Sequence, residues 1–391
     1  MPGRLFITLT FVCLFLVVGQ LSAQETSLQW PANISSRLDQ AGDNRAELES
    51  ALQQVTPEHR QALEFLIEHM PEGDLRSLSA EFLIDNIELA YTAIDQVPWG
   101  EQIPDSIFLN DVLPYASVDE TREAWRKEMM DRCLKIVTDC QTPGEAAQKL
   151  NRELFPLINV RYATSREKAN QSPSESMDQS VASCTGLSIL LTDACRSVGV
   201  PARLAGTPSW TKKRGNHTWV EVWDGEWQFT GAAEPSDQGL NHAWFSHDAS
   251  QADASQPLNR IYATSFAETG LYFPMVWSMR SRDVPAVDVT QRYTEGRTEQ
   301  AASLCRVLIG IRSADGTRLS REITVSSLQD EELRWSGNTR DESADLNDLL
   351  SLQLPRNHKF RITWQENGQP RDLERATEAS EQVYWELQLD P

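Results

Sequence analysis

Cys184 stands at the start of an apolar segment, SCTGLSILLTDACRSVGVPAR, which covers residues 183–203. Apolar residues recur there at helical spacing and Gly199 precedes a proline by two positions, so the pattern predicts a helix from Cys184 to about Val198. Unpaired amide N–H groups and the positive end of the helix dipole favour an anion in the first turn. The position therefore predicts a reactive thiolate, whereas Cys195, inside the apolar stripe, is expected to be a structural thiol.

A thiolate nucleophile needs a proton acceptor, and His217 is the histidine that the sequence places on a rigid element. It begins HTWVEVWDGEWQF, residues 217–229, an alternating stretch that turns at Asp224-Gly225. The alternation predicts a strand with His217 and Trp219 on one face and valines on the other. A strand holds an imidazole in a fixed orientation, as general-base chemistry requires. Together the two residues predict a cysteine nucleophile with a histidine base.

These motifs, in this order, resemble the transglutaminase-like superfamily over roughly residues 125–245. They are the cysteine that opens the helix, RSVGVPAR at 196–203, HTWVEVW at 217–223, and a tryptophan after a turn. The resemblance implies a core similar to that of papain-type cysteine proteases. It also implies a Cys-His-Asp triad that transfers an acyl group from an amide to an amine or to water. In this sequence Cys184 matches the nucleophile and His217 matches the base.

One position departs from the family pattern. The family's aspartate usually follows the tryptophan after the hairpin by four residues, and here Trp227 is followed at that distance by Gly231. The third role could fall to Glu234 or another acid, to a backbone group, or to no residue at all, which would leave a dyad. Glu234 is the candidate for the third catalytic residue, because Asp224 is first of all a turn signal.

The charge balance excludes some classes of partner. The formal charge is −21, from 57 acidic and 36 basic residues among 391, and a surface of that sign repels nucleic acid and anionic lipid. His242, His247 and Asp248 could be metal ligands, but no paired cysteines or HExxH-type spacing accompany them. We therefore expect no metal and no cofactor. The expected partner is a peptide or protein substrate, and the sequence does not set the oligomeric state.

The first 23 residues carry the pattern of a cleavable secretory signal. Arg4 precedes an apolar run too short for a spanning helix, and Leu21-Ser22-Ala23 offers a cleavage site. The expected location is secreted or periplasmic, with no transmembrane segment after signal removal; an uncleaved anchor is the alternative. Loss of Cys13 with the signal would leave five cysteines, so at least one thiol is unpaired or pairs between chains.

Hydrophobic periodicity divides the remaining chain into three parts. They are a helical N-terminal region at 24–120, the transglutaminase-like domain at 121–295 and a small β-sandwich at 300–391. In the last part, short strands flank the turn signals Asp315-Gly316 and Asn367-Gly368. The expected fold class is α+β, with a papain-like transglutaminase core between the helical region and the sandwich.

The favoured function is an exported cysteine peptidase, amidase or acyltransferase. Cys184 would attack a peptide or carboxamide carbonyl and form a thioester, while His217 takes and returns the proton. The amide of Cys184 and the side chain of Gln179 are candidates for holding the oxyanion. The alternative, favoured by Gly231, is a non-catalytic transglutaminase-like module that binds peptide or glycan at the cell envelope.

Overall fold

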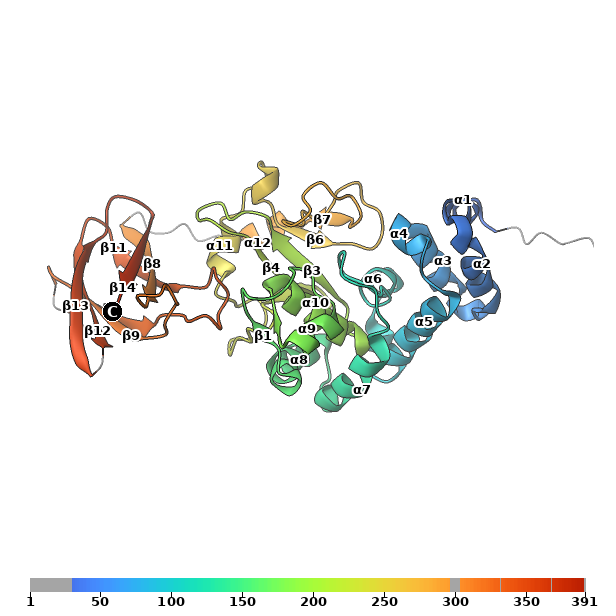
Figure 1. The fold of residues 1–391 in the computed structure, drawn as a ribbon, viewed down its shortest axis with the longest axis horizontal. Helices are drawn as coiled ribbons and strands as arrows, with labels where there is room; N and C mark the ends of the chain where they lie inside the picture. Colours follow the sequence, from blue (N-terminus) through green and yellow to red (C-terminus); the bar gives the residue numbers. More distant parts are fainter. Residues whose placement is uncertain (1–29, 296–302, 331, 367, 390–391) are drawn as a thin grey trace, which may run out of the picture.

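The computed structural model describes residues 30–295, 303–330, 332–366 and 368–389. The chain forms an elongated molecule with the N-terminal helices at one end, a mixed helix-and-sheet core in the middle and two β-sheets at the other end (Figure 1). The predicted α+β class is confirmed. The predicted signal, residues 1–23, lies outside the described residues. Within the described ranges, no helix has the length and apolar character needed to cross a membrane.

The N-terminal helices pack around a core of their own. They are α1 (Ala32–Gln40), α2 (Arg45–Gln54), α3 (Arg60–His69), α4 (Glu72–Leu75), α5 (Ala80–Asp95) and α6 (Asp105–Asp111). Ser79 caps α5 by accepting a hydrogen bond from the amide of Phe82. The apolar stripes of these helices meet in one buried cluster, which includes Leu38, Leu66 and Ile87. This region therefore has an interior that is independent of the sheet.

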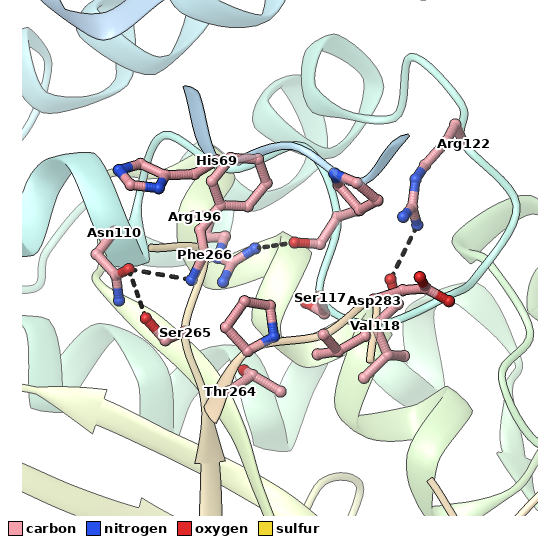
Figure 2. Close-up of a pocket in the computed structure, with 14 residues that line it drawn as sticks. His69, Asn110, Ser117, Val118, Arg122, Arg196, Thr264, Ser265, Phe266 and Asp283 are labelled. Carbon is pink, nitrogen blue, oxygen red and sulfur yellow. Dashed lines mark hydrogen bonds between the residues drawn. The ribbon is translucent and has the colours of Figure 1, made fainter. Parts of the chain in front are cut away.

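Polar contacts join the helical end to the core (Figure 2). Asn110 of α6 accepts hydrogen bonds from the Ser265 hydroxyl and the Phe266 amide, both at 3.0 Å. Arg196 donates to the carbonyl of Ala116 at 2.9 Å. The cavity between these residues measures only about 30 Å³, which is room for roughly one water molecule and no substrate.

The core is built on a five-stranded antiparallel sheet in the order β5-β4-β3-β6-β7. The strands are β3 (Ala202–Thr207), β4 (His217–Trp223), β5 (Trp227–Thr230), β6 (Tyr262–Thr264) and β7 (Ala286–Asp288). The helices are α7 (Arg126–Val137), α8 (Pro143–Ile158), α9 (Pro173–Gln179), α10 (Cys184–Ser197), α11 (Ser246–Ser250) and α12 (Thr290–Thr294). A parallel pair, β1 (Arg161–Tyr162) and β2 (Val181–Ala182), lies beside α10.

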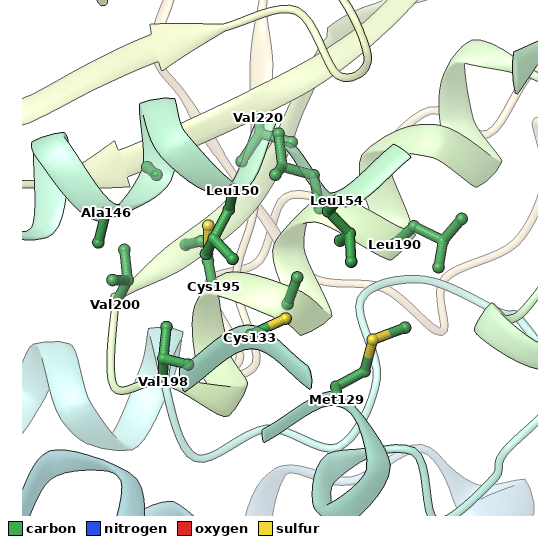
Figure 3. Packing of buried hydrophobic residues seen from close by; sticks show 14 of the residues in the cluster. Met129, Cys133, Ala146, Leu150, Leu154, Leu190, Cys195, Val198, Val200 and Val220 are labelled. Atoms are coloured by element: carbon green, nitrogen blue, oxygen red, sulfur yellow. The ribbon is translucent and has the colours of Figure 1, made fainter. Parts of the chain in front are cut away.

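The helix α10 is the centre of the core, and every one of its residues except Cys184 is buried. Side chains of α7, α8, α10 and β4 meet in one apolar cluster, in which Cys195 lies with Cys133, Leu150 and Val220 (Figure 3). Trp219 packs into a different cluster on the other face of β4, so the predicted alternation along this strand is confirmed. Within the described residues all five cysteines are unpaired.

The C-terminal part is a sandwich of two sheets that share one core. The first sheet has the order β10-β9-β12-β13 and the second β11-β8-β14. The strands are β8 (Leu304–Arg312), β9 (Glu322–Ser327), β10 (Arg334–Asn338), β11 (Leu350–Pro355), β12 (Lys359–Glu366), β13 (Gln369–Ala376) and β14 (Gln382–Gln388). Buried residues of both sheets, among them Ile309, Val325 and Phe360, form the common cluster.

The two predicted hairpin turns of the sandwich have different outcomes. The strands on either side of the second turn, β12 and β13, pair as an antiparallel hairpin through Glu366 and Gln369. The strands around Asp315-Gly316, β8 and β9, lie in different sheets and share only an isolated bridge between Arg312 and Arg318. The residues between the turn and Glu322 let the chain cross from one sheet to the other, so the local turn signal did not determine the pairing.

Candidate active site

Cys184 is the first residue of α10, as the sequence predicts. The hydroxyl oxygen of Ser183 caps the helix by accepting a hydrogen bond from the amide of Gly186 at 3.0 Å. Gly186 allows close packing, because a Cβ there would lie 3.0 Å from the Cβ of Ala182 in β2. The cysteine is only partly buried, unlike the other four described cysteines. The helix start therefore presents a thiol that a reagent or substrate can reach.

His217 is the first residue of β4 and is 2% exposed. Aromatic rings surround its imidazole: the ring centroids of Trp244 and Phe245 lie 4.8 and 4.9 Å away. The ring also stacks with Trp219 at 5.9 Å. This packing restricts the imidazole to one orientation, which is what the sequence predicted a strand position would provide.

A third residue, Asp345, completes a grouping with these two. The carboxylate Oδ2 of Asp345 lies 3.5 Å from Nδ1 of His217, and the Asp345 side chain is 1% exposed. One functional atom each of Cys184, His217 and Asp345 lies within 4.8 Å of the others. Asp345 belongs to the loop between β10 and β11, so the acid comes from the C-terminal sandwich rather than from the core.

The charges in this group support one another. Burial alone would lower the pKa of His217, but the negative charges of Asp345 and Cys184 raise it to about 10. Burial opposes ionisation of Asp345 as well, yet the positive imidazole and the bonds from Asn347 hold the pKa of this carboxyl below its usual value. The arrangement thus favours a protonated ring beside a negative carboxylate.

The contacts of the imidazole are longer than hydrogen bonds. Among the described residues, neither ring nitrogen of His217 has a hydrogen-bond partner, and Oδ2 of Asp345 has none. The 3.5 Å between Nδ1 and Oδ2 is an ion-pair distance. Catalytic hydrogen bonds are often long in the free enzyme and shorten when substrate binds, so this geometry is compatible with catalysis.

Glu234, the acid that the sequence favoured for the third role, lies elsewhere in the site. Its Oε2 accepts a hydrogen bond from Nε1 of Trp244 at 2.8 Å, and it bridges to Gly231 in a tight turn after β5. Burial raises the pKa of Glu234 to about 8, although the charge of His217 opposes this. The carboxylate that faces the imidazole is that of Asp345, whereas the carboxyl group of Glu234 accepts from an indole, so a catalytic role for Glu234 stays a prediction.

The other sequence candidates have separate partners. Asp224 lies in the β4–β5 turn and accepts a hydrogen bond from the amide of Gly144 at 3.2 Å. The side-chain oxygen of Gln179 accepts from the amide of Glu167 at 3.2 Å, so its oxyanion role stays a prediction. Asp248 forms ion pairs with Lys213 and Arg306 instead of a metal-ligand set with the nearby histidines.

The triad atoms are also of the types that bind zinc. A zinc-bound histidine directs one nitrogen to the metal that the other ligands share. Here Nδ1 of His217 faces the carboxylate of Asp345, and the imidazole also interacts electrostatically with Cys184. The imidazole therefore lies with a thiol and an acid in a grouping like that of a catalytic triad.

A cavity of about 640 Å³ lies beside this group. Its walls come from the core, through Leu187 and Trp244, and from the sandwich, through Ser343 and Ala344. Tyr162 lines it too and is close enough to Cys184 to interact with the thiol electrostatically. The volume is within the range of ligand sites, so both parts of the molecule shape the space next to the nucleophile.

Asp345 is the site residue that sequence reasoning missed. It lies in TRDESADLNDLL, residues 339–350, where acids alternate irregularly with small residues and resemble a solvated loop. Gly231 at the family's aspartate position left open an acid from another segment, a backbone group or a dyad. No periodicity in this loop could have identified which one.

Comparisons with known proteins identify a family match for part of the chain. Residues 131–248 match the transglutaminase-like superfamily. Among solved structures, a candidate cysteine protease from Cytophaga hutchinsonii matches with 17% identity over 29% of this chain and a TM-score of 0.25. Red sea bream transglutaminase matches with 10% identity over 72% of this chain and a TM-score of 0.31. The chain spans 40% and 65% of the lengths of these two structures. No curated protein matches.

Proposed function

Since the chain contains a transglutaminase-like superfamily domain at residues 131–248, we propose that it is an exported cysteine enzyme that cleaves or transfers acyl groups. Its substrates are peptide or carboxamide bonds, and its intermediate is a thioester on Cys184. The observation that carries the proposal is the grouping of Cys184, His217 and Asp345 within 4.8 Å. A half-buried thiol, an enclosed imidazole and a buried carboxylate are the three parts of cysteine acyl transfer.

The reaction follows from the positions of these groups. The Cys184 thiolate attacks the carbonyl carbon, and the developing oxyanion is held by the amide of Cys184 at the start of α10. The C–N bond breaks as protonated His217 gives its proton to the leaving amine. His217 then takes a proton from an incoming water or amine, whose oxygen or nitrogen attacks the thioester. The carbon–sulfur bond breaks, and the thiolate and the imidazolium are restored.

The acid and the cavity have distinct parts in this reaction. Asp345 faces Nδ1 of His217, so it orients the ring and stabilises its positive charge. The cavity walled by Leu187, Trp244 and the sandwich loop offers the acyl chain or the leaving group a place near the three residues. The imidazole and the carboxylate are themselves buried, and burial strengthens the interaction between their charges because it removes water.

A thiol-labelling experiment tests the nucleophile. Native protein is treated with iodoacetamide, and the modified cysteine is identified by mass spectrometry. We expect rapid labelling of Cys184 in the wild type and no rapid labelling in Cys184→Ala. Cys195→Ala is the matched control and should be labelled like the wild type. Labelling that is unchanged in Cys184→Ala would contradict the proposal.

A substrate experiment tests the reaction class. Libraries of peptides and glutamine amides are incubated with and without added primary amine, and products are separated by mass. Hydrolysed product indicates a peptidase or amidase, while amine adduct indicates a transferase. The proposal requires one of the two, and requires that Cys184→Ala forms neither.

The second candidate function is a non-catalytic module that binds peptide or glycan at the cell envelope. Gly231, at the position where the family carries its aspartate, favours it. It predicts that ligand binds equally well to Cys184→Ala and to the wild type, with no turnover by either. Export is tested independently by N-terminal sequencing of the mature protein, for which we expect a start at Gln24.

A further inference from the structure

Asp345 is held in place by a hydrogen-bonded bracket that spans the two parts of the molecule. Its Oδ1 accepts hydrogen bonds from the amide of Asn347 at 2.8 Å and from Nδ2 of Asn347 at 3.0 Å. The same Nδ2 donates to the carbonyl of Asn216 at 2.9 Å, one residue before His217. One side chain, that of Asn347, therefore joins the acid of the sandwich to the residue that precedes His217 in the core.

The approach of Asn347 depends on a glycine. Gly215 has φ of +100°, and a Cβ at this position would lie 2.0 Å from Oδ1 of Asn347. No other residue type leaves space for the amide. The core backbone at Gly215 thus leaves space for the side chain of Asn347 from the sandwich loop.

A buried ion network lies behind the bracket. Asp248 of α11 in the core accepts hydrogen bonds from Lys213 at 2.7 Å and from both terminal nitrogens of Arg306 in β8 of the sandwich. The side chains of Arg306, Asp248 and Lys213 are 5, 3 and 10% exposed. Lys213 also donates to the backbone carbonyl of Asn347 at 3.2 Å. The network therefore connects the first strand of the sandwich to the loop that carries the acid.

We propose that Arg306, through Asp248 and Lys213, is a positioning residue that holds the sandwich loop on the core and so keeps Asp345 opposite His217. The inference rests on the proposed function for its catalytic meaning. On this basis the sandwich is part of the active site, and its docking on the core controls the completeness of the triad. Arg306 touches neither substrate nor reacting atoms.

The physical reason is the environment of the network. Removing one member of a buried ion group leaves the other charges without full compensation, which is strongly unfavourable. Without Arg306, only Lys213 would remain to balance Asp248, and the sandwich would lose its buried ionic link to α11. Docking would then depend on uncharged acceptors in the backbone, through the bonds from Asn347 to Asn216 and from Lys213 to Asn347.

The test compares Arg306→Met with Arg312→Met, the matched control. Both arginines lie on β8, but Arg312 pairs with Glu386 within the sandwich and is 32% exposed. The first readout is the pKa of His217, followed by NMR of labelled imidazoles and assigned by its loss in His217→Gln. The titratable groups that face this ring are Cys184, Glu234 and Asp345, and Asp345 is in turn influenced by Lys213 and Asp348.

We expect Arg306→Met to titrate His217 at lower pH, as Asp345→Asn does, and Arg312→Met to titrate it as the wild type does. We also expect Arg306→Met to reduce kcat/KM by about 10- to 100-fold, with Arg306→Lys recovering part of the loss. In the Asp345→Asn background the same substitution should change kcat/KM by less than about twofold, because it acts through Asp345.

An unchanged His217 titration in Arg306→Met would overturn the inference, whether or not the protein is an enzyme. If Arg306→Met lowers kcat/KM in the Asp345→Asn background by as much as it does in the wild type, the inference is overturned too. If Arg306→Met does not fold, Arg306→Lys replaces it, since it keeps the charge but loses the contact of two nitrogens with Asp248; an unchanged His217 titration in that variant would overturn the inference as well. Failure of the proposed function can be distinguished from failure of this inference. If the protein is not an enzyme, the wild type shows no turnover, but the NMR titrations of the wild type and the variants can still be compared.

Discussion

Two segments bring a carboxyl group toward the imidazole of His217, and they hold it differently. In the core, the turn after β5 carries Glu234, whose one hydrogen bond among those described comes from Trp244. In the sandwich, the loop before β11 carries Asp345, whose Oδ1 accepts two bonds from Asn347. Burial raises the pKa of Glu234 to about 8, whereas the imidazole and these donors lower that of Asp345.

The comparison teaches what makes a buried acid useful to a histidine. Burial penalises both carboxylates, and only donors or a positive partner can offset that penalty. Asp345 has two donors from Asn347 and faces the imidazole directly, so it favours the charged form that stabilises an imidazolium. Glu234 has one donor, and the negative charges of Asp345 and Asp348 add to the effect of burial, so its pKa is raised to about 8. Proximity along the chain to the hairpin of His217 is therefore a poorer guide than the bonds around the carboxylate.

The largest effect is expected from Asp345→Asn. It should lower kcat/KM by about 10²- to 10⁴-fold, the range seen when an orienting acid is lost. The carboxylate raises the pKa of His217 to about 10 against the effect of burial, so without it the ring should lose its proton at lower pH. The alkaline limb of the pH profile of kcat/KM should shift downward accordingly. An unshifted limb would show that Asp345 does not act on the ring.

A smaller effect is expected from Gly215→Ala. The added Cβ meets Oδ1 of Asn347, and the positive φ costs a non-glycine residue about 1–3 kcal/mol. We expect about tenfold lower kcat/KM, because the displaced Asn347 no longer holds Asp345 in place; this loss corresponds to about 1.4 kcal/mol of transition-state stabilisation. Gly225→Ala is the matched control, because Gly225 also has positive φ but its Cβ would meet nothing within 4 Å. Equal losses in the two variants would argue for backbone strain alone.

Restoring an acid at the core position should recover part of the activity. In the Asp345→Asn background, Gly231→Asp is expected to raise kcat/KM by about three- to tenfold, because it adds a carboxylate beside Glu234, whose charge interacts with His217. The new Cβ would lie 2.4 Å from Oε2 of Glu234, a flexible side-chain end that can move. Gly231→Asn in the same background is the control, and equal rates for the two would refute a charge effect.

The smallest effect is expected from Glu234→Gln. The amide oxygen can still accept from Trp244, and below the pKa of about 8 it replaces a neutral group by a neutral group. We expect kcat/KM within about twofold of the wild type at neutral pH and a difference only above pH 8. A loss as large as that of Asp345→Asn would reverse the comparison between the two acids.

The sequence predicts those parts of the site that local patterns determine. The helix cap, the apolar stripe and the alternation of β4 placed Cys184 and His217 correctly because each depends on neighbours along the chain. Asp345 depends on the docking of a separate domain, and its loop has neither helical nor strand periodicity. The pairing of β8 with β9 could not be predicted for the same reason. A turn signal predicts a bend in the chain, but the sheet that each strand joins depends on packing with residues distant in the sequence.

The aromatic enclosure of His217 has an optical consequence. Trp210, Trp219 and Trp244 lie with ring centroids 6.3, 5.9 and 4.8 Å from the imidazole. A protonated imidazole quenches the fluorescence of an indole that it contacts, and a neutral one does so far less. The fluorescence of these tryptophans should therefore increase as His217 loses its proton, so the intrinsic fluorescence of the protein reports the protonation state of His217.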